Sequence, residues 1–113
     1  MNNTELTIKA KIKYVQDTLF VISGKWKLSI MIAVSQGNHR FRDIQRNVPS
    51  ISTRVLSKEL KELELNKLLS RKVDEWQPKL VEYAVTPYCK SLAPVVESMI
   101  EWGRNHRKKI AEK

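Results

Sequence analysis

The stretch from Ser52 to Leu65 predicts a helix with two chemically different sides, and this feature limits the folds open to the chain. At 100° per residue, Leu56, Leu60 and Leu63 fall on one side and need a core to bury them. The other side carries hydroxyl groups and cations, at Thr53, Arg54, Ser57, Lys58 and Lys61. A helix of this kind can place its polar side in the major groove of DNA and contact base edges there. The alternative interpretation is a basic helix face that is simply solvated.

The flanking sequence predicts short elements that fit around this helix. Helices are expected at 8–22, 25–35, 42–47, 52–65 and 87–110, a short strand at 39–41, and a hairpin of strands 68–73 and 80–85. Ser52 and Thr86 are good N-cap residues, and Pro87 suits the first helical position. Gly24 and Asn66 suit helix ends. Pro94 is expected to kink the last helix or to begin a second one.

This order predicts a mainly α fold with a small β-hairpin (α+β), in which a two-stranded wing follows three helices. That architecture is a winged helix-turn-helix. We expect a single domain over 1–113. It would consist of an N-terminal dimerisation helix at 1–22, a DNA-binding core with its wing at 25–86, and a C-terminal dimerisation helix at 87–110.

The charge balance points to a polyanionic partner. The chain has 113 residues with 21 basic and 12 acidic side chains, a formal net charge of +9 and a pI near 9.9. Nucleic acid is the first candidate and an anionic membrane the second; a charge that serves only solubility is the third interpretation. No apolar run approaches the roughly 20 residues that span a bilayer. We therefore expect a cytoplasmic protein with no membrane partner.

Several classes of chemistry find little support. The single cysteine, Cys89, excludes an internal disulfide and a multi-cysteine zinc site, so we expect no metal. The two histidines, His39 and His106, lie on different predicted elements, and no glycine-rich phosphate loop or Ser/His/Asp order is present. We expect neither an enzyme nor a cofactor.

Three separated stretches resemble the HxlR-type family of bacterial transcription regulators, which are relatives of the MarR-type winged-helix proteins. They read GKWKLSIM, then FRDIQRNVPSISTRVLSKELKELELNKLLSRKV, then VEYAVTPYCKSLAPVVESMIEWG. The resemblance covers about residues 15 to 103. It implies a homodimer that binds an inverted-repeat DNA operator, with the helix at 52–65 in the major groove and the wing at 68–85 on the backbone or minor groove.

Carried over to this chain, the resemblance implies three groups of DNA contacts. The recognition helix would read bases with Ser52, Thr53, Arg54, Ser57 and Lys58, and would meet the backbone with Lys61. The wing would use Arg71, Lys72, Gln77 and Lys79. Phosphate clamps would come from Arg40, Arg42, Gln45 and Arg46, and the start of the second helix would offer an anion site at Lys25 and Lys27. We expect Trp26 in the core and favour Trp76 folded back over the hairpin, the alternative being a wedge against a sugar.

The first and last helices carry apolar stripes longer than a compact winged core needs. We expect them to form the dimer interface, with Ile8, Ile12, Val15 and Leu19 on one helix and Val95, Met99, Trp102 and His106 on the other. The alternative is that each helix packs on its own protomer. A small-molecule effector, unidentified, would bind between these helices and the core, among Trp26, Phe20, Met31, Met99 and Trp102.

Some relatives in this family sense oxidants through a cysteine before the first core helix, but residues 11–15 here contain none. Cys89 stands at the start of the last helix, where the helix N-terminus can lower a thiol pKa. It is therefore a possible redox residue, and a small packing residue is the favoured interpretation. Two rival functions also remain, a charge-driven nucleic-acid binder without sequence preference and a winged module that binds a protein.

Overall fold

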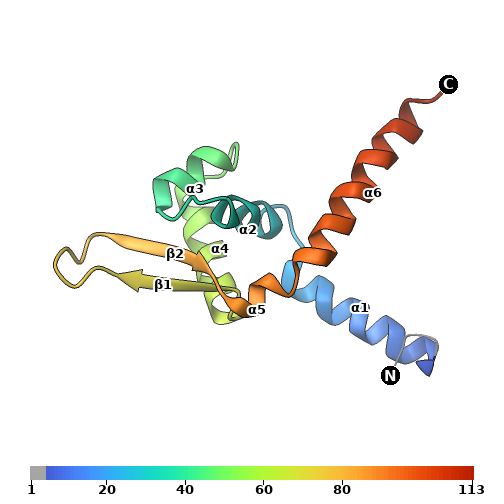
Figure 1. The fold of residues 1–113 in the computed structure, drawn as a ribbon, viewed down its shortest axis with the longest axis horizontal. Helices are drawn as coiled ribbons and strands as arrows, with labels where there is room; N and C mark the ends of the chain where they lie inside the picture. The colour runs from blue at the N-terminus through green and yellow to red at the C-terminus, as the bar shows by residue number, and fades with distance from the viewer. Residues whose placement is uncertain (1–4) are drawn as a thin grey trace.

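The computed structural model describes residues 5–113 and contains a helical body with a two-stranded hairpin. The elements follow in the order α1 (Ile8–Ile22), α2 (Lys27–Ser35), α3 (Phe41–Asn47), α4 (Thr53–Leu65), β1 (Leu69–Val73), β2 (Val81–Val85), α5 (Pro87–Lys90) and α6 (Ala93–Ala111). Helices α2, α3 and α4 form the body (Figure 1). The hairpin extends from one side of this body, and α1 and α6 project from the other. The mainly α fold with a small hairpin is thus confirmed.

Almost all core residues belong to the segment of the sequence that runs from α2 to β1. Its fully buried side chains are large and aliphatic, and they are Ile30, Val34, Ile44, Val48, Leu56, Leu60, Leu63, Leu68 and Leu69. Leu56, Leu60 and Leu63 are the predicted apolar side of the helix at 52–65, and each is at most 1% exposed. In contrast, α1 buries only Ile22, and α6, all of which the structure describes, buries no residue. The two outer helices are therefore attached to the core only near their inner ends.

Local hydrogen bonds fix the ends of α4. The Ser52 hydroxyl accepts from the backbone N–H of Val55 at 3.1 Å, which confirms the predicted N-cap. At the other end, the Leu68 N–H donates to Leu63 O and the Lys67 N–H donates to Glu64 O, the two bonds of a Schellman ending. Asn66 is the C-cap as predicted, but the left-handed residue is Lys67, with φ +64°. Lysine at this position retains the steric cost that glycine avoids.

The hairpin is antiparallel, with Leu69 opposite Val85 and Val73 opposite Val81. The predicted third strand at 39–41 is wrong, because α3 already begins at Phe41. Of residues 39–41, only His39 forms a backbone hydrogen bond with the hairpin. The N–H of Tyr83 donates to His39 O at 2.7 Å, and His39 Nδ1 lies 3.0 Å from the Tyr83 carbonyl oxygen, so in this bond the ring nitrogen is the donor.

The expected single helix at 87–110 is two helices. Thr86 caps α5 by accepting from the Cys89 N–H at 3.0 Å, and its own hydroxyl donates to Lys67 O at 2.7 Å. The chain then leaves the helix at Ser91 and Leu92 and begins α6 at Ala93. Pro94 lies in the first turn of α6, where its missing N–H costs nothing, so the prediction of a second start is confirmed. Within residues 5–113 no single helix is long and apolar enough to cross a membrane; α1 and α2 reach that length and composition only as a pair bent by 68°.

Candidate nucleic-acid interface

Helices α3 and α4 and the turn between them form a helix-turn-helix. Val48 and Ile51 are buried at the two sides of this turn, and the Ile51 N–H donates to Val48 O at 3.4 Å. Ser50, between them, has φ +71° and turns the chain sharply. The half-buried Gln45 of α3 donates through Nε2 to Ile51 O at 3.3 Å and to the Thr53 hydroxyl at 3.2 Å. The first turn of α4 is therefore held against α3.

The polar side of α4 faces solvent. Its exposed residues are Ser52, Thr53, Arg54, Ser57, Lys58 and Lys61. Among residues 5–113, no ion pair involves Arg54, Lys58 or Lys61. The helix wheel also places Glu64 on this side, but in the last turn, about three turns from Ser52. The first two turns of α4 thus present hydroxyl groups and unpaired cations without a competing acid.

Two further acids of α4 share an ion pair with one lysine of α2. Lys27 Nζ lies 2.7 Å from Glu59 Oε2 and 2.6 Å from Glu62 Oε2. The Lys27 and Glu59 side chains are only 13% and 12% exposed. Burial acts to lower the pKa of Lys27, but the hydrogen bonds to Glu59 and Glu62 outweigh it and raise the pKa above 10.5. The hydrogen bond from Lys27 lowers the pKa of Glu62 below 4.5.

This pairing overturns the expected anion site at the start of the second helix. Helix α2 begins at Lys27, not at Lys25, and the Lys27 ammonium is occupied by the two carboxylates. Lys25 precedes the helix and lies over the ring of the half-buried Trp26, 4.8 Å from its centroid. Lys25 stays exposed, so it can still meet a phosphate, but through its side chain and not at a helix N-terminus.

The other expected phosphate clamps differ in how free they are. Arg40 bonds Glu82 of β2 at 3.3 Å, and Arg46 bonds Asp43 one turn earlier in α3 at 3.5 Å. Both pairs are well exposed, so a phosphate can replace the carboxylate at little cost. Arg42 is also exposed, and residues 5–113 provide it with no ion pair.

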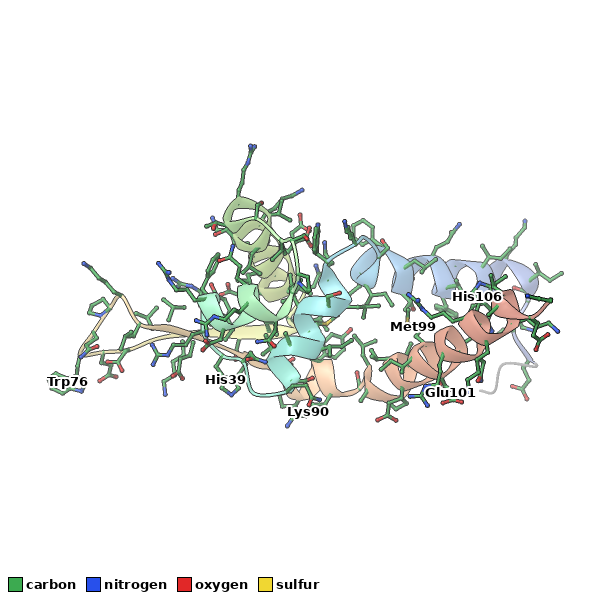
Figure 2. All side chains as sticks on the ribbon, turned by 90° about the horizontal axis from the view of Figure 1, so that it is seen from above. His39, Trp76, Lys90, Met99, Glu101 and His106 are labelled. Atoms are coloured by element: carbon green, nitrogen blue, oxygen red, sulfur yellow. The ribbon has the colours of Figure 1, made fainter. Side chains whose placement is uncertain are left out.

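The wing ends in a tight loop that carries its expected contacts outward. Arg71, Lys72, Gln77 and Lys79 are all exposed. Asp74 Oδ1 accepts from the backbone N–H groups of Trp76 at 2.8 Å and Gln77 at 3.0 Å, and this bonding fixes the loop. Trp76 is 90% exposed and stands at the far tip (Figure 2), so the prediction that it folds back over the hairpin is wrong.

Cys89 is a packing residue in this structure. It is buried, and its Sγ lies 3.7 Å from Met31 Sδ. Burial raises the pKa of the Cys89 thiol above its usual value, so the helix N-terminus does not produce a reactive thiolate here.

An apolar cavity of about 350 Å³ lies between α2, α5 and α6. This is between the core and the last helix, as expected for an effector site, but the lining residues differ from those expected. The lining includes Met31, Ile32, Val85, Cys89, Val96 and Ile100. Of the five residues expected to gather around an effector, only Met31 lines it. Phe20 and Trp102 are instead strongly exposed on the outer helices, which diverge from the body (Figure 1).

The apolar stripes of the outer helices are uncovered. Exposed hydrophobic residues include Ile8, Ile12, Val15 and Leu19 on α1 and Val95, Met99 and Trp102 on α6. His106 is also exposed and stacks on Trp102, with ring centroids 4.8 Å apart. Met99 and His106 project from one side of α6, and Glu101 projects from the other (Figure 2). Each of these hydrophobic side chains is at least 42% exposed in the described protomer, which argues against the alternative in which the outer turns of α1 and α6 pack on their own protomer.

A recognition helix held against a second helix, followed by a hairpin wing, defines the class of winged helix-turn-helix proteins, which bind DNA. The sequence profile of the HxlR-like helix-turn-helix family matches residues 21–111. The chain therefore belongs to the HxlR-like family and is a transcriptional regulator of the helix-turn-helix type, as the sequence motifs indicate.

Individual relatives agree with this assignment. The uncharacterized HTH-type transcriptional regulator YybR of Bacillus subtilis is 40% identical over 93 residues, which are 82% of this chain and 74% of YybR. Among solved structures, the redox regulator HypR in its reduced form matches with a TM-score of 0.79 at 38% identity, over 85% of this chain and 95% of HypR. A MarR-family regulator from Enterococcus faecalis V583 matches with a TM-score of 0.76 at 33% identity, over 98% of both chains.

Sequence reasoning missed two elements of the interface. The bonds from Lys27 to Glu59 and Glu62 join residues more than 30 positions apart, and the only local signal is a pair of acids three residues apart beside the apolar stripe of α4. The turn made by Asp74 was visible in principle, because aspartate favours side-chain bonds to the backbone two and three residues later.

Proposed function

We propose that this regulator acts as a homodimer that binds an inverted-repeat operator in a sequence-specific manner. Helix α4 would enter the major groove, and the wing would contact the adjacent backbone or minor groove. The observation that carries the proposal is the polar side of α4, where Arg54 is exposed and unpaired while Glu59 and Glu62 are held in bonds to Lys27. Arginine suits guanine, whose O6 and N7 accept its two N–H groups together.

The dimer part of the proposal is supported by the exposed stripes of α1 and α6. Exposed apolar surfaces of this extent on a small domain mark contact sites. Two-fold symmetry would then place two α4 helices about one DNA turn apart, and the operator would be a pseudo-palindrome. HypR is described as a redox regulator. This proposal contains no cysteine-based redox step, because the only thiol here, Cys89, is buried.

The experiment is a selection from a random duplex DNA library at physiological salt, where purely electrostatic binding is weak. We expect an enriched inverted repeat with half-site centres about 10 bp apart. Retained binding without enrichment would instead assign a charge-driven binder, and no binding would favour a protein partner.

Variants of the enriched site then test α4 directly. Arg54→Ala should cost roughly 1–3 kcal/mol at one operator position and leave nonspecific binding nearly unchanged. Arg104→Ala is the matched control, since Arg104 lies on α6, on the side away from Trp102. An equal loss from both variants would contradict base reading by Arg54.

The dimer requires its own measurement. Val15→Glu places a carboxylate in the α1 stripe and should convert the dimer to monomer in sedimentation analysis, because an unpaired charge cannot be buried at an apolar interface. Lys13→Glu puts the same group on another side of α1 and should leave the dimer intact. A wild-type monomer at micromolar concentration would refute this part of the proposal.

A further inference from the structure

The wing tip presents a large apolar side chain to solvent. Trp76 is 90% exposed, more than any other large hydrophobic residue in the described chain. It stands at the end of the hairpin, far from the apolar stripes of α1 and α6 (Figure 2). Burial of an exposed indole gives one of the largest apolar free-energy gains that a single side chain can contribute to a contact. The position of Trp76 therefore suggests a binding partner.

The turn below Trp76 is built to present it. The Asp74 carboxylate accepts from the N–H of Trp76 itself and from that of Gln77, and Leu80 N–H donates to Gln77 O at 2.8 Å. These bonds hold the backbone at the tip without restraining the indole. The Asp74 carboxylate is occupied by two of these bonds. Glu75, the other acid of the loop, has no hydrogen bond from its side chain among the described residues.

The hairpin that carries Trp76 has three cations, against the two acids of the loop, Asp74 and Glu75. Arg71 and Lys72 lie on β1, and Lys79 lies on the returning arm of the loop. All three are exposed and none forms an ion pair within residues 5–113. An indole on a hairpin that carries these cations fits a surface that alternates phosphates with apolar sugars. A protein partner of matching chemistry would need acidic groups around an apolar pocket.

We propose that Trp76 is the non-polar contact of the wing with the deoxyribose wall of the minor groove that flanks each half-site. The ring would pack on sugar carbons, and its Nε1–H would donate to a phosphate oxygen. Lys79 and Arg71 would neutralise the neighbouring phosphates. This inference rests on the proposed operator binding and adds a contact outside the bases that α4 reads.

The length of the hairpin places this contact beyond the recognition helix. A strand of five residues spans about 17 Å, and the loop adds to it. The indole therefore reaches DNA that flanks the half-site, and its contribution depends on whether that DNA is present. This dependence separates Trp76 from every residue of α4.

The test compares full-length wild type with Trp76→Ala and Trp76→Phe on two duplexes, one long and one trimmed to the half-sites. On the long duplex, Trp76→Ala should weaken binding about tenfold, which corresponds to roughly 1.4 kcal/mol. Trp76→Phe should remain within about threefold of wild type, because phenylalanine keeps an aromatic face. On the trimmed duplex, wild type and Trp76→Ala should bind equally.

The salt dependence distinguishes an apolar contact from an electrostatic one. Trp76→Ala should leave the slope of log K against log salt unchanged. The control is Lys79→Ala, three residues further along the same loop, which should reduce the magnitude of the slope by about one. Circular dichroism and the unfolding midpoint should not change in Trp76→Ala, since the side chain is 90% exposed.

A second measurement detects the contact in protein that keeps Trp76. In protein labelled with 5-fluorotryptophan, the ¹⁹F signal assigned to Trp76 by its loss in Trp76→Phe should shift on the long duplex and stay in place on the trimmed one. Equal affinity of wild type and Trp76→Ala on the long duplex, or an equal loss on both duplexes, would overturn the inference. Failure of wild type to bind any duplex would instead refute the proposed operator binding, and the inference with it.

Discussion

Replacing Lys27 with methionine should destabilise the protein by about 2–3 kcal/mol. Methionine keeps the apolar stem of lysine but removes the ammonium that lies 2.7 Å from Glu59 Oε2. Breaking a fully buried ion pair costs about 3–5 kcal/mol because a charge is left unpaired in the interior. Here the Lys27 and Glu59 side chains are 13% and 12% exposed, so some water reaches the stranded carboxylate and reduces the cost. Glu62 is 37% exposed and can be hydrated, so it contributes the smaller part of this loss.

The pH dependence of this effect follows from the two shifted groups. The pKa of Glu62 is lowered below 4.5 in the folded state, so its contribution is present above pH 4.5 and is lost as the pH falls through the lowered pKa. The pKa of Lys27 is raised above 10.5, so its contribution is complete below pH 10.5 and is lost as the pH rises through the raised pKa. The difference between wild type and Lys27→Met should therefore be largest between about pH 5 and pH 10.

Urea unfolding at a fixed protomer concentration measures the difference, because the proposed dimerisation would make stability depend on concentration. Lys61→Met is the matched control, since Lys61 is exposed on α4 and forms no ion pair among the described residues, and it should change the free energy of unfolding by less than about 0.5 kcal/mol. A loss below 1 kcal/mol in Lys27→Met, or the same loss at pH 3 as at pH 7, would refute the assignment of the pair as a stabilising junction between α2 and α4.

Three further results are expected. Lys67→Gly should raise the free energy of unfolding by roughly 0.5–1 kcal/mol, because glycine removes the steric cost of φ +64° at the end of α4; unchanged or lower stability in thermal unfolding would contradict this. Leu56→Ala should lower it by about 2–5 kcal/mol in urea, since Leu56 is fully buried and leaves a cavity, and a loss below 1 kcal/mol would mean that α4 is not packed as described. At pH 7, iodoacetamide should label Cys89 slowly in the folded protein and rapidly in urea, as followed by mass spectrometry, because burial raises the pKa of the thiol; fast labelling of the folded protein would overturn the buried placement.

The elements that the sequence predicts well are those whose signals are local. The apolar stripe at Leu56, Leu60 and Leu63 and the cap at Ser52 determine α4 within 14 residues. Likewise, alternation at Val81, Tyr83 and Val85 indicates β2, with every second residue partly buried. The separate family motifs add the order of these elements, and together they predict the winged fold.

The parts that the sequence does not predict depend on contacts between distant segments. No strand forms at 39–41. His39 bonds Tyr83, but α3 already begins at Phe41. No residue near Lys27 in the sequence indicates that it bonds to Glu59 and Glu62 of α4. The position of Trp76 at the wing tip depends on the conformation of the whole loop from residue 74 to residue 80, which the periodicity of the sequence does not report. Whether the exposed stripes meet a second protomer is likewise a property of two chains and stays a prediction.

The break at Ser91 and Leu92 turns α6 into a lever. Its 19 residues span about 28 Å. A rotation of 10° at the break therefore moves the far end by about 5 Å, which is a sizeable fraction of the 34 Å between successive turns of DNA. The core holds α6 only at its inner end. In the proposed dimer, a few backbone angles at this break would therefore control the spacing of the two protomers.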